Sequence, residues 1–403
     1  MRIVCSQTQN QSGVAYSDLN FETNTLYAST TPPNTIRLPF FGDVDCVISW
    51  GDGTYQTVVS SVPTNIDKSY AVGGTYNISI KGKVSGFGWR TAPPAFGFAN
   101  KINKVFRWGN VGLTSIWGFF RGNTYLFGFP HYIPSTITDL SDCFNSAGFS
   151  NPNFFKYPLE TWEISNVTNL GNTFRGNTGN NIDISSWNTT NVTNMGGTFA
   201  GANSFNRNIS SWNTSNVTSM AEMFLNATAF NQPVNTWDTS KVTSFTNMFR
   251  SATNFNQPVN SWNTSSAIVM GSMFLFASSF NQPVSNWNVS NVTSLSGIFQ
   301  SATSFNQNLG NWNLRTAGVI LSGIFASNAI NTENYSRTLI GWANNITANG
   351  GPFNITVTAT GKTYHNVNYG GTPYSTAVAA RAYLTTPVAS GGAGWTITGD
   401  TLV

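Results

Sequence analysis

The chain has 403 residues, which predicts about two to four domains, and its 40% hydrophobic and 14% aromatic residues supply a core and exclude a disordered protein. Charged residues make up only 8%, and the net charge of +4 comes from positions spread along the chain rather than from a basic block. This balance excludes a nucleic-acid partner, which would need clustered lysine and arginine to neutralise phosphates.

Residues 1–20 are predicted to form a polar N-terminal arm. The chain turns polar after its first few residues, which predicts no secretory signal peptide, and no apolar run is long enough for a transmembrane helix. Cys5, Cys46 and Cys143 lie too far apart to indicate a disulfide framework or a zinc site.

Residues 21–104 are predicted to form a small β-sandwich, because segments such as 46–50 and 76–80 alternate between apolar and polar residues. Asp43, Asp45 and Asp52 raise the alternative of a calcium site. Their spacing does not match an EF-hand loop, so capping of a turn is the preferred role of Asp52.

A 25-residue repeat dominates the next part of the chain and predicts a solenoid of about nine repeats over residues 105–326. Tryptophans and phenylalanines both recur at this interval. The tryptophan column is in phase with the other apolar positions, so we expect a buried core rather than a platform on which sugars stack. Its members are Trp187, Trp212, Trp237, Trp262, Trp287 and Trp312.

Each repeat is predicted to hold one short strand and one short helix. The apolar positions from Val217 to Phe230 mostly fall three or four residues apart, as on one face of a helix. Residues 234–237 follow a proline and include a β-branched residue, so they are the expected strand. One repeat cannot bury its apolar face alone, so neighbours must stack.

Polar columns beside the core supply the candidate binding residues. Side chains in register can hydrogen-bond sugar hydroxyls or another protein's backbone, although a solvated face is the preferred interpretation. An adjacent asparagine column, from Asn206 to Asn306, is better explained by turns and by bonds to neighbouring backbone than by sugar binding. The candidates are Arg207, Gln232, Gln257, Gln282, Gln307 and Arg250.

Residues 327–403 leave the repeat and are predicted to form a mixed α/β cap over the last repeat, with a helix at 376–384. An enzyme is disfavoured, because neither histidine lies in a nucleophile motif and the repeats hold few carboxylates. No catalytic residue, metal site or cofactor is predicted. The groups weighed are His131, His365, Asp183, Glu222 and Asp238.

Residues 212–233, WNTSNVTSMAEMFLNATAFNQP, resemble the repeat of BspA-like leucine-rich-repeat surface proteins. Residues 48–54, ISWGDGT, with 74–78, are similar to the PKD-like domain that often precedes such repeats. The resemblance implies a leucine-rich-repeat-like solenoid that follows an Ig/PKD-like all-β sandwich and ends in a mixed cap. It also implies a surface protein for attachment or display rather than an enzyme.

Cell-surface members of that family carry a secretion signal that this sequence does not show. The sequence therefore favours a virion-surface protein, such as a phage fibre, spike or capsid decoration protein that adheres to a host surface or to glycans. The alternative is a bacterial cell-surface adhesin, and a polysaccharide-degrading enzyme is less favoured.

The expected partners are other virion or surface-assembly proteins, docked through the N-terminal region, and a host-surface glycan or protein. Homo-oligomeric docking, for example as a trimer, suits a fibre. Neither a nucleic acid nor insertion into a membrane is expected.

Overall fold

The computed structural model describes residues 18–25, 34–88, 102–123, 126, 128–147, 159–179, 181–315 and 318–403. The chain divides into two compact units, Met1–Asn191 and Val192–Val403. Most of the predicted N-terminal arm, residues 1–17, lies outside the described residues.

The first unit contains one antiparallel sheet of six strands, in the order β3-β2-β5-β1-β6, with β4 paired to another part of β2. The strands are β1 (Leu19–Asn24), β2 (Thr35–Ser49), β3 (Tyr55–Ser60), β4 (Thr64–Ser69), β5 (Thr75–Phe87) and β6 (Ile102–Arg107). Its buried face includes Leu19, Ile48 and Ile80.

The predicted β-sandwich is wrong, because the strands form a single sheet. Strands β2 and β5, of 15 and 13 residues, are long enough to pair with different neighbours along their length. The pairing shifts at a bulge between Phe41 and Val44, where Gly42 has φ +70°, a value that side chains with a Cβ disfavour. One continuous sheet therefore bends where two sheets were expected.

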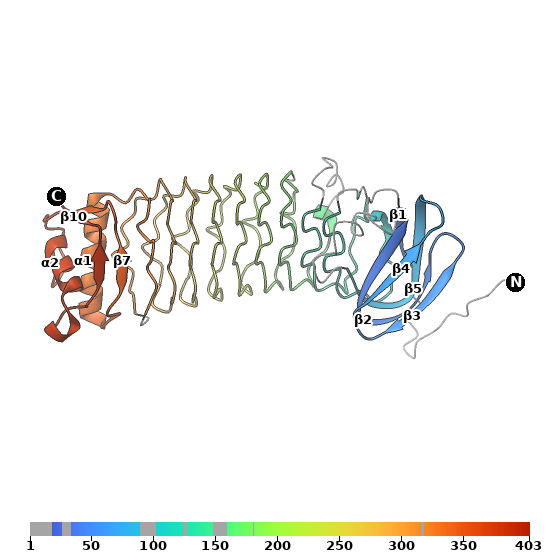
Figure 1. Cartoon of the computed structure of the whole chain (residues 1–403), viewed down its shortest axis with the longest axis horizontal. Coiled ribbons are helices and arrows are strands. Elements are labelled where there is room, and N and C mark those ends of the chain that lie inside the picture. The colour runs from blue at the N-terminus through green and yellow to red at the C-terminus, as the bar shows by residue number, and fades with distance from the viewer. Residues whose placement is uncertain are drawn as a thin grey trace. The chain divides into compact units, whose positions relative to one another are not determined.

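In the second unit, successive 25-residue segments, called rungs below and exemplified by residues 212–236, lie side by side (Figure 1). One parallel β-bridge joins each rung to the next. The bridges pair Asn194 with Ser219, Ser219 with Ser244, Ser244 with Val269, Val269 with Ser294 and Ser294 with Ile320. The first unit has comparable bridges, from Ser115 to Asp139 and from Asp139 to Asn169.

The predicted fold class, a leucine-rich-repeat-like solenoid of strand–helix turns, is wrong. Both α-helices of the described chain follow the last rung, and residues 234–237 close a tight turn instead of pairing as a strand. Where a helix was expected, over residues 217–230, the backbone forms a series of turns. Alternate N–H groups in residues 222–227 donate to the carbonyl three residues earlier, and those between them donate to the next rung. Those inter-rung donors include Glu222, Phe224 and Asn226, which bond Thr246, Met248 and Arg250 at 2.8–2.9 Å.

Aromatic side chains fill the interior of the rungs. Phe224 and Phe249 stack with ring centroids 5.5 Å apart, and Phe249 and Phe274 repeat that distance. Trp287 stacks between Trp262 and Trp312 at 6.4 Å on either side. The repeat period therefore places like rings upon like rings.

Residues beyond the last rung form a cap of two helices and two small parallel sheets, in which β7 pairs with β9 and β8 with β10. The elements are α1 (Thr332–Asn349), β7 (Thr356–Thr358), β8 (Thr363–Tyr364), α2 (Ala377–Thr385), β9 (Thr396–Thr398) and β10 (Thr401–Leu402), and short 3-10 turns lie at Leu159–Thr161 and Val388–Ser390. Helix α2 confirms the predicted helix at 376–384, whereas α1 was not predicted.

Two backbone positions in each rung have a left-handed conformation, and Phe276 occupies the second of them with φ +61° and 48% of its surface exposed. The equivalent residues in other rungs are Gly201, Asn226, Ser251 and Ser301, which are small or polar. A bulky residue in this region is strained by about 1–3 kcal/mol.

Replacing Phe276 with asparagine is therefore expected to raise the free energy of unfolding by about 1 kcal/mol, since asparagine tolerates the left-handed region. The reciprocal change, Asn226→Phe, should lower it by a similar amount. Urea denaturation followed by circular dichroism measures both, and a destabilised Phe276→Asn variant would show that the ring contributes more than its strain costs.

Candidate functional site

The asparagine column forms a continuous hydrogen-bonded ladder between rungs. The Asn256 side-chain oxygen accepts the backbone N–H of Asn281 at 3.0 Å and the side-chain nitrogen of Gln282 at 3.0 Å. The same pair of bonds recurs at the oxygens of Asn206, Asn231 and Asn281.

The cap continues this ladder without a break. The Asn306 oxygen accepts the N–H of Asn331 at 2.9 Å and the side-chain nitrogen of Asn334 at 3.0 Å. Asn331 is also the N-cap of α1, where its oxygen accepts from the N–H of Asn334 at 2.9 Å. Helix α1 thus presents to the last rung the donors that another rung would supply.

The predicted glutamine ladder is engaged in these structural bonds. The side-chain nitrogens of Gln232, Gln257, Gln282 and Gln307 each donate to the preceding rung, and all four residues are half-buried. Arg207 is exposed at the head of this column, and Arg250 is half-buried elsewhere in its rung. The structure therefore gives the glutamines an architectural role that their sequence positions did not reveal.

Replacing Asn256 with alanine is expected to lower the free energy of unfolding by about 1–3 kcal/mol, because the half-buried N–H of Asn281 loses its acceptor and the side-chain nitrogen of Gln282 keeps only the Asn256 backbone carbonyl. Asn256→Asp, which keeps an oxygen in place, should retain most of the stability. Urea titration of both variants measures the difference, and equal losses would show that the acceptor oxygen is not what matters.

The tryptophans of the repeat are buried, and indole nitrogens along the column donate to backbone carbonyls. Trp187, Trp212, Trp237, Trp262, Trp287 and Trp312 are 0–4% exposed. In the second unit, the indole N–H of Trp262 donates to Val234 O at 2.9 Å, and equivalent bonds link Trp237, Trp287 and Trp312 to the preceding rung. Trp342 of α1 makes a similar bond to Leu309 O at 3.0 Å.

Three of the five groups weighed for catalysis, Asp183, Asp238 and His365, have side-chain hydrogen-bond partners within the chain. Asp183 and Asp238 each accept the backbone N–H of the serine two residues later. His365 Nδ1 lies 3.4 Å from Ser336 Oγ, but that hydroxyl is fully buried and donates to Thr332 O at 2.7 Å. Such a serine cannot meet a substrate.

Burial governs the titration of the described thiols and of one lysine. Desolvation, aided by Asp45, raises the pKa of Cys46 to about 12, and desolvation raises the pKa of Cys143 as well. Neither thiol is a ready nucleophile, because the thiolate is the reactive form. Burial also lowers the pKa of Lys362, whose ammonium group donates to Asn328 O at 2.6 Å in the cap.

Asp52 caps its turn, as expected, by accepting the N–H of Thr54 at 3.0 Å, and its carboxylate pairs with Lys68 at 2.7 Å. Desolvation raises the pKa of Asp52, but the bonds from Lys68 and Thr54 outweigh it and hold the pKa at about 2. The pair therefore stabilises the sheet above pH 3.8, and the contribution is lost as the pH falls towards 2.

Among the described residues, no group of three histidine, cysteine or acidic side chains is placed to hold a metal ion.

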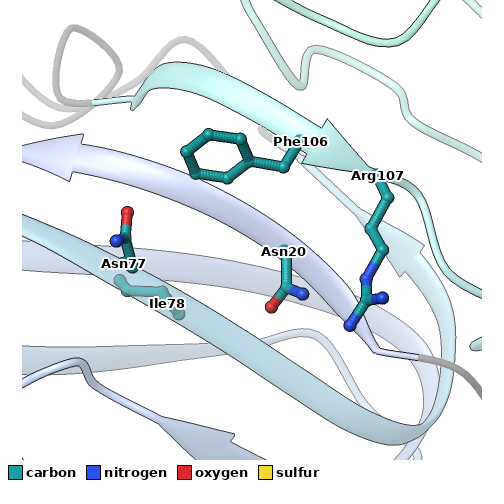
Figure 2. A pocket seen from close by; sticks show the side chains of 5 residues that line it. All are labelled: Asn20, Asn77, Ile78, Phe106 and Arg107. Atoms are coloured by element: carbon teal, nitrogen blue, oxygen red, sulfur yellow. The ribbon is translucent and has the colours of Figure 1, made fainter.

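A cavity of about 430 Å³ lies on the first unit's sheet, where β1, β5 and β6 run side by side (Figure 2). Phe106 and Arg107 extend from β6 towards Asn20 on β1 and Asn77 on β5, and Ile78 completes the lining. This site was not predicted from the sequence, since its residues come from three separate segments.

Comparison with known families identifies the repeat. Residues 138–250 and 232–337 match a family described as "Mycoplasma protein of unknown function, DUF285". The repeat region is DUF285-like. This match supports a surface-associated repeat protein of the BspA-like type.

No curated protein and no solved structure is significantly similar to the chain. The family match does not reach the N-terminal sheet, so the PKD-like resemblance stays a prediction. Within the described parts of the chain, neither helix combines the length and apolarity that a membrane span requires.

Proposed function

We propose that this chain is a non-enzymatic attachment protein of the BspA-like type, displayed on a cell surface. The match of residues 138–337 to DUF285 is the observation that carries the proposal. It favours the cell-surface alternative over the virion protein that the sequence first suggested, and nothing in the comparisons supports a phage fibre, spike or decoration protein.

The chemistry of the rungs supports a scaffold that presents a surface. Their aromatic side chains other than Phe276 are buried, and the asparagine and glutamine columns bond neighbouring rungs. The exposed positions are mainly uncharged polar residues, such as Thr218 and Thr243, whose hydroxyls donate to the preceding rung. Such a framework can carry ligand-binding residues without itself performing chemistry.

Antibodies raised against the purified chain test this proposal on the cells that produce it. Intact cells should be labelled as strongly as permeabilised cells, and brief protease treatment of intact cells should remove the label. Labelling only after permeabilisation would contradict surface display. Immunogold labelling confined to released phage particles would instead restore the virion interpretation.

A further inference from the structure

We propose that the sheet-face cavity lined by Asn20, Asn77, Ile78, Phe106 and Arg107 binds a neutral pyranose sugar, an inference that rests on the proposed attachment function and names its ligand class. Phe106 would stack on the sugar ring. The side chains of Asn20, Asn77 and Arg107 would hydrogen-bond its hydroxyl groups.

A β-bulge builds this arrangement. The register of β1 with β6 shifts between Asn20 and Phe21, so that Asn20 faces Arg107 while Phe21 faces Val105, and Phe106 is the extra residue. Neighbouring residues of a regular strand point to opposite faces of the sheet, but bulges re-aim side chains. Here Phe106 and Arg107 are both exposed, although Val105 and Trp108 on either side of them are buried.

The ring of Phe106 is available to a ligand and is held in place. It is 46% exposed, so part of the ring is open to a ligand. The Lys104 ammonium group lies 5.0 Å from the ring centroid, within the range of a cation–π contact. A single apolar ring among polar neighbours suits a ligand with one apolar face and a hydroxylated edge, as a pyranose has.

The side chains of Asn20, Asn77 and Arg107 match the hydroxylated edge of a pyranose. Each asparagine carboxamide both donates and accepts hydrogen bonds, and the guanidinium group is a fork of donors. Hydroxyl groups also donate and accept, so each can pair with either kind of group. The cavity volume of about 430 Å³ falls within the range of small-ligand sites, roughly 300–1,000 Å³.

Charge and strand pairing disfavour other ligand classes. Besides Lys104 and Arg107, the carboxylates of Asp18, which accepts from Ser79, and of Glu22, which accepts from Asn103, lie at or beside β1. A polyanion would meet these carboxylates as well as the cations. An extended peptide would need a free strand edge, but the outer edge of β6 already pairs with Gly128, whose carbonyl accepts from Val105 at 2.8 Å.

A glycan array probed with the full-length chain tests the proposal. The array carries neutral sugars (lactose, N-acetyllactosamine, chitobiose and mannobiose) beside acidic ones (sialyllactose and hyaluronan fragments). We expect binding to at least one neutral sugar, and saturation-transfer NMR should show contact through its ring protons. Binding to none of the sugars, or to acidic sugars alone, would overturn the assignment.

Variants then locate the site. Phe106→Ala should weaken binding of the best array sugar at least tenfold, and Asn77→Ala several-fold, with unchanged circular dichroism spectra because both residues are exposed. Phe276→Ala is the matched control, since Phe276 is a comparably exposed phenylalanine on a rung, and it should bind as the unmodified chain does. An unaffected Phe106→Ala variant, or equal loss in both variants, would exclude the sheet-face cavity. Surface labelling requires no sugar, so a displayed chain without sugar binding would refute this inference alone.

Discussion

Replacing Trp237 with alanine is expected to lower the free energy of unfolding of the Val192–Val403 unit by about 3–5 kcal/mol, the usual cost of truncating a buried large aromatic side chain. Trp237 is 4% exposed, its ring centroid lies 6.3 Å from that of Phe224, and its indole N–H donates to Ile209 O at 3.2 Å. The variant therefore gains a cavity, and Ile209 O keeps only the backbone N–H of Trp212 as a donor. For a unit of this size the melting temperature should fall by roughly 6–20 °C, which differential scanning calorimetry of the full chain measures.

Trp50→Ala supplies the comparison for this experiment. Trp50 is 1% exposed in the first unit, where its carbonyl accepts the hydroxyl of Tyr70 at 2.8 Å. Its loss should destabilise the sheet and leave the transition of the rungs in place. A Trp237→Ala variant whose transition did not move would show that the buried tryptophan column contributes little to the stability of the rungs.

The period of the repeat could be predicted from the sequence, but the local structure of a rung could not. Apolar residues spaced three or four apart satisfy a helix, and they equally satisfy a series of tight turns that direct the same side chains inward. The difference lies in where alternate N–H groups point, and residues such as Glu222 find their acceptor 24 residues later, in the next rung. A pattern read within one repeat cannot contain that partner.

The residues of helix α1 in the cap carry a helical pattern that was not recognised in the sequence. Tyr335, Leu339, Trp342 and Ile346 recur at helical spacing, and Asn331 provides an N-cap, so α1 could have been predicted from these residues. The many asparagines and threonines of this segment obscured the pattern, because such residues usually favour turns.

The candidate site was beyond prediction for a different reason. Phe106 and Arg107 share a face only because β6 pairs with β1 in a shifted register, across more than 80 residues of sequence. Conversely, Gln232 and its equivalents were candidate binding residues, because the sequence of one repeat does not show that the acceptor of each side chain lies in the preceding rung. Both cases concern long-range partners rather than residue chemistry.

Replacing Arg381 with alanine is expected to destabilise the cap by about 3–5 kcal/mol, because it would leave a buried carboxylate without its counter-charge. The Asp400 side chain is fully buried and accepts from Arg381 Nε at 2.8 Å, from Arg381 Nη2 at 2.7 Å and from the hydroxyl of Tyr335 at 2.9 Å. The hydrogen bond to Asp400 raises the pKa of Arg381, as expected if the pair holds both charges in place.

The double variant Arg381→Met with Asp400→Leu separates two quantities: the cost of leaving the buried Asp400 carboxylate unpaired, and the net contribution of the ion pair to stability. Replacing both members of a buried ion pair with apolar residues of similar volume is often neutral or stabilising, so this variant should recover most of the loss. Hydrogen exchange of the full chain measures the result locally, since faster exchange in Arg381→Ala should begin at α1 and α2 and spread to the last rungs that α1 covers. If the double variant were as unstable as Arg381→Ala, the specific bonds of Arg381 and Asp400, rather than charge neutralisation, would be what fastens the cap.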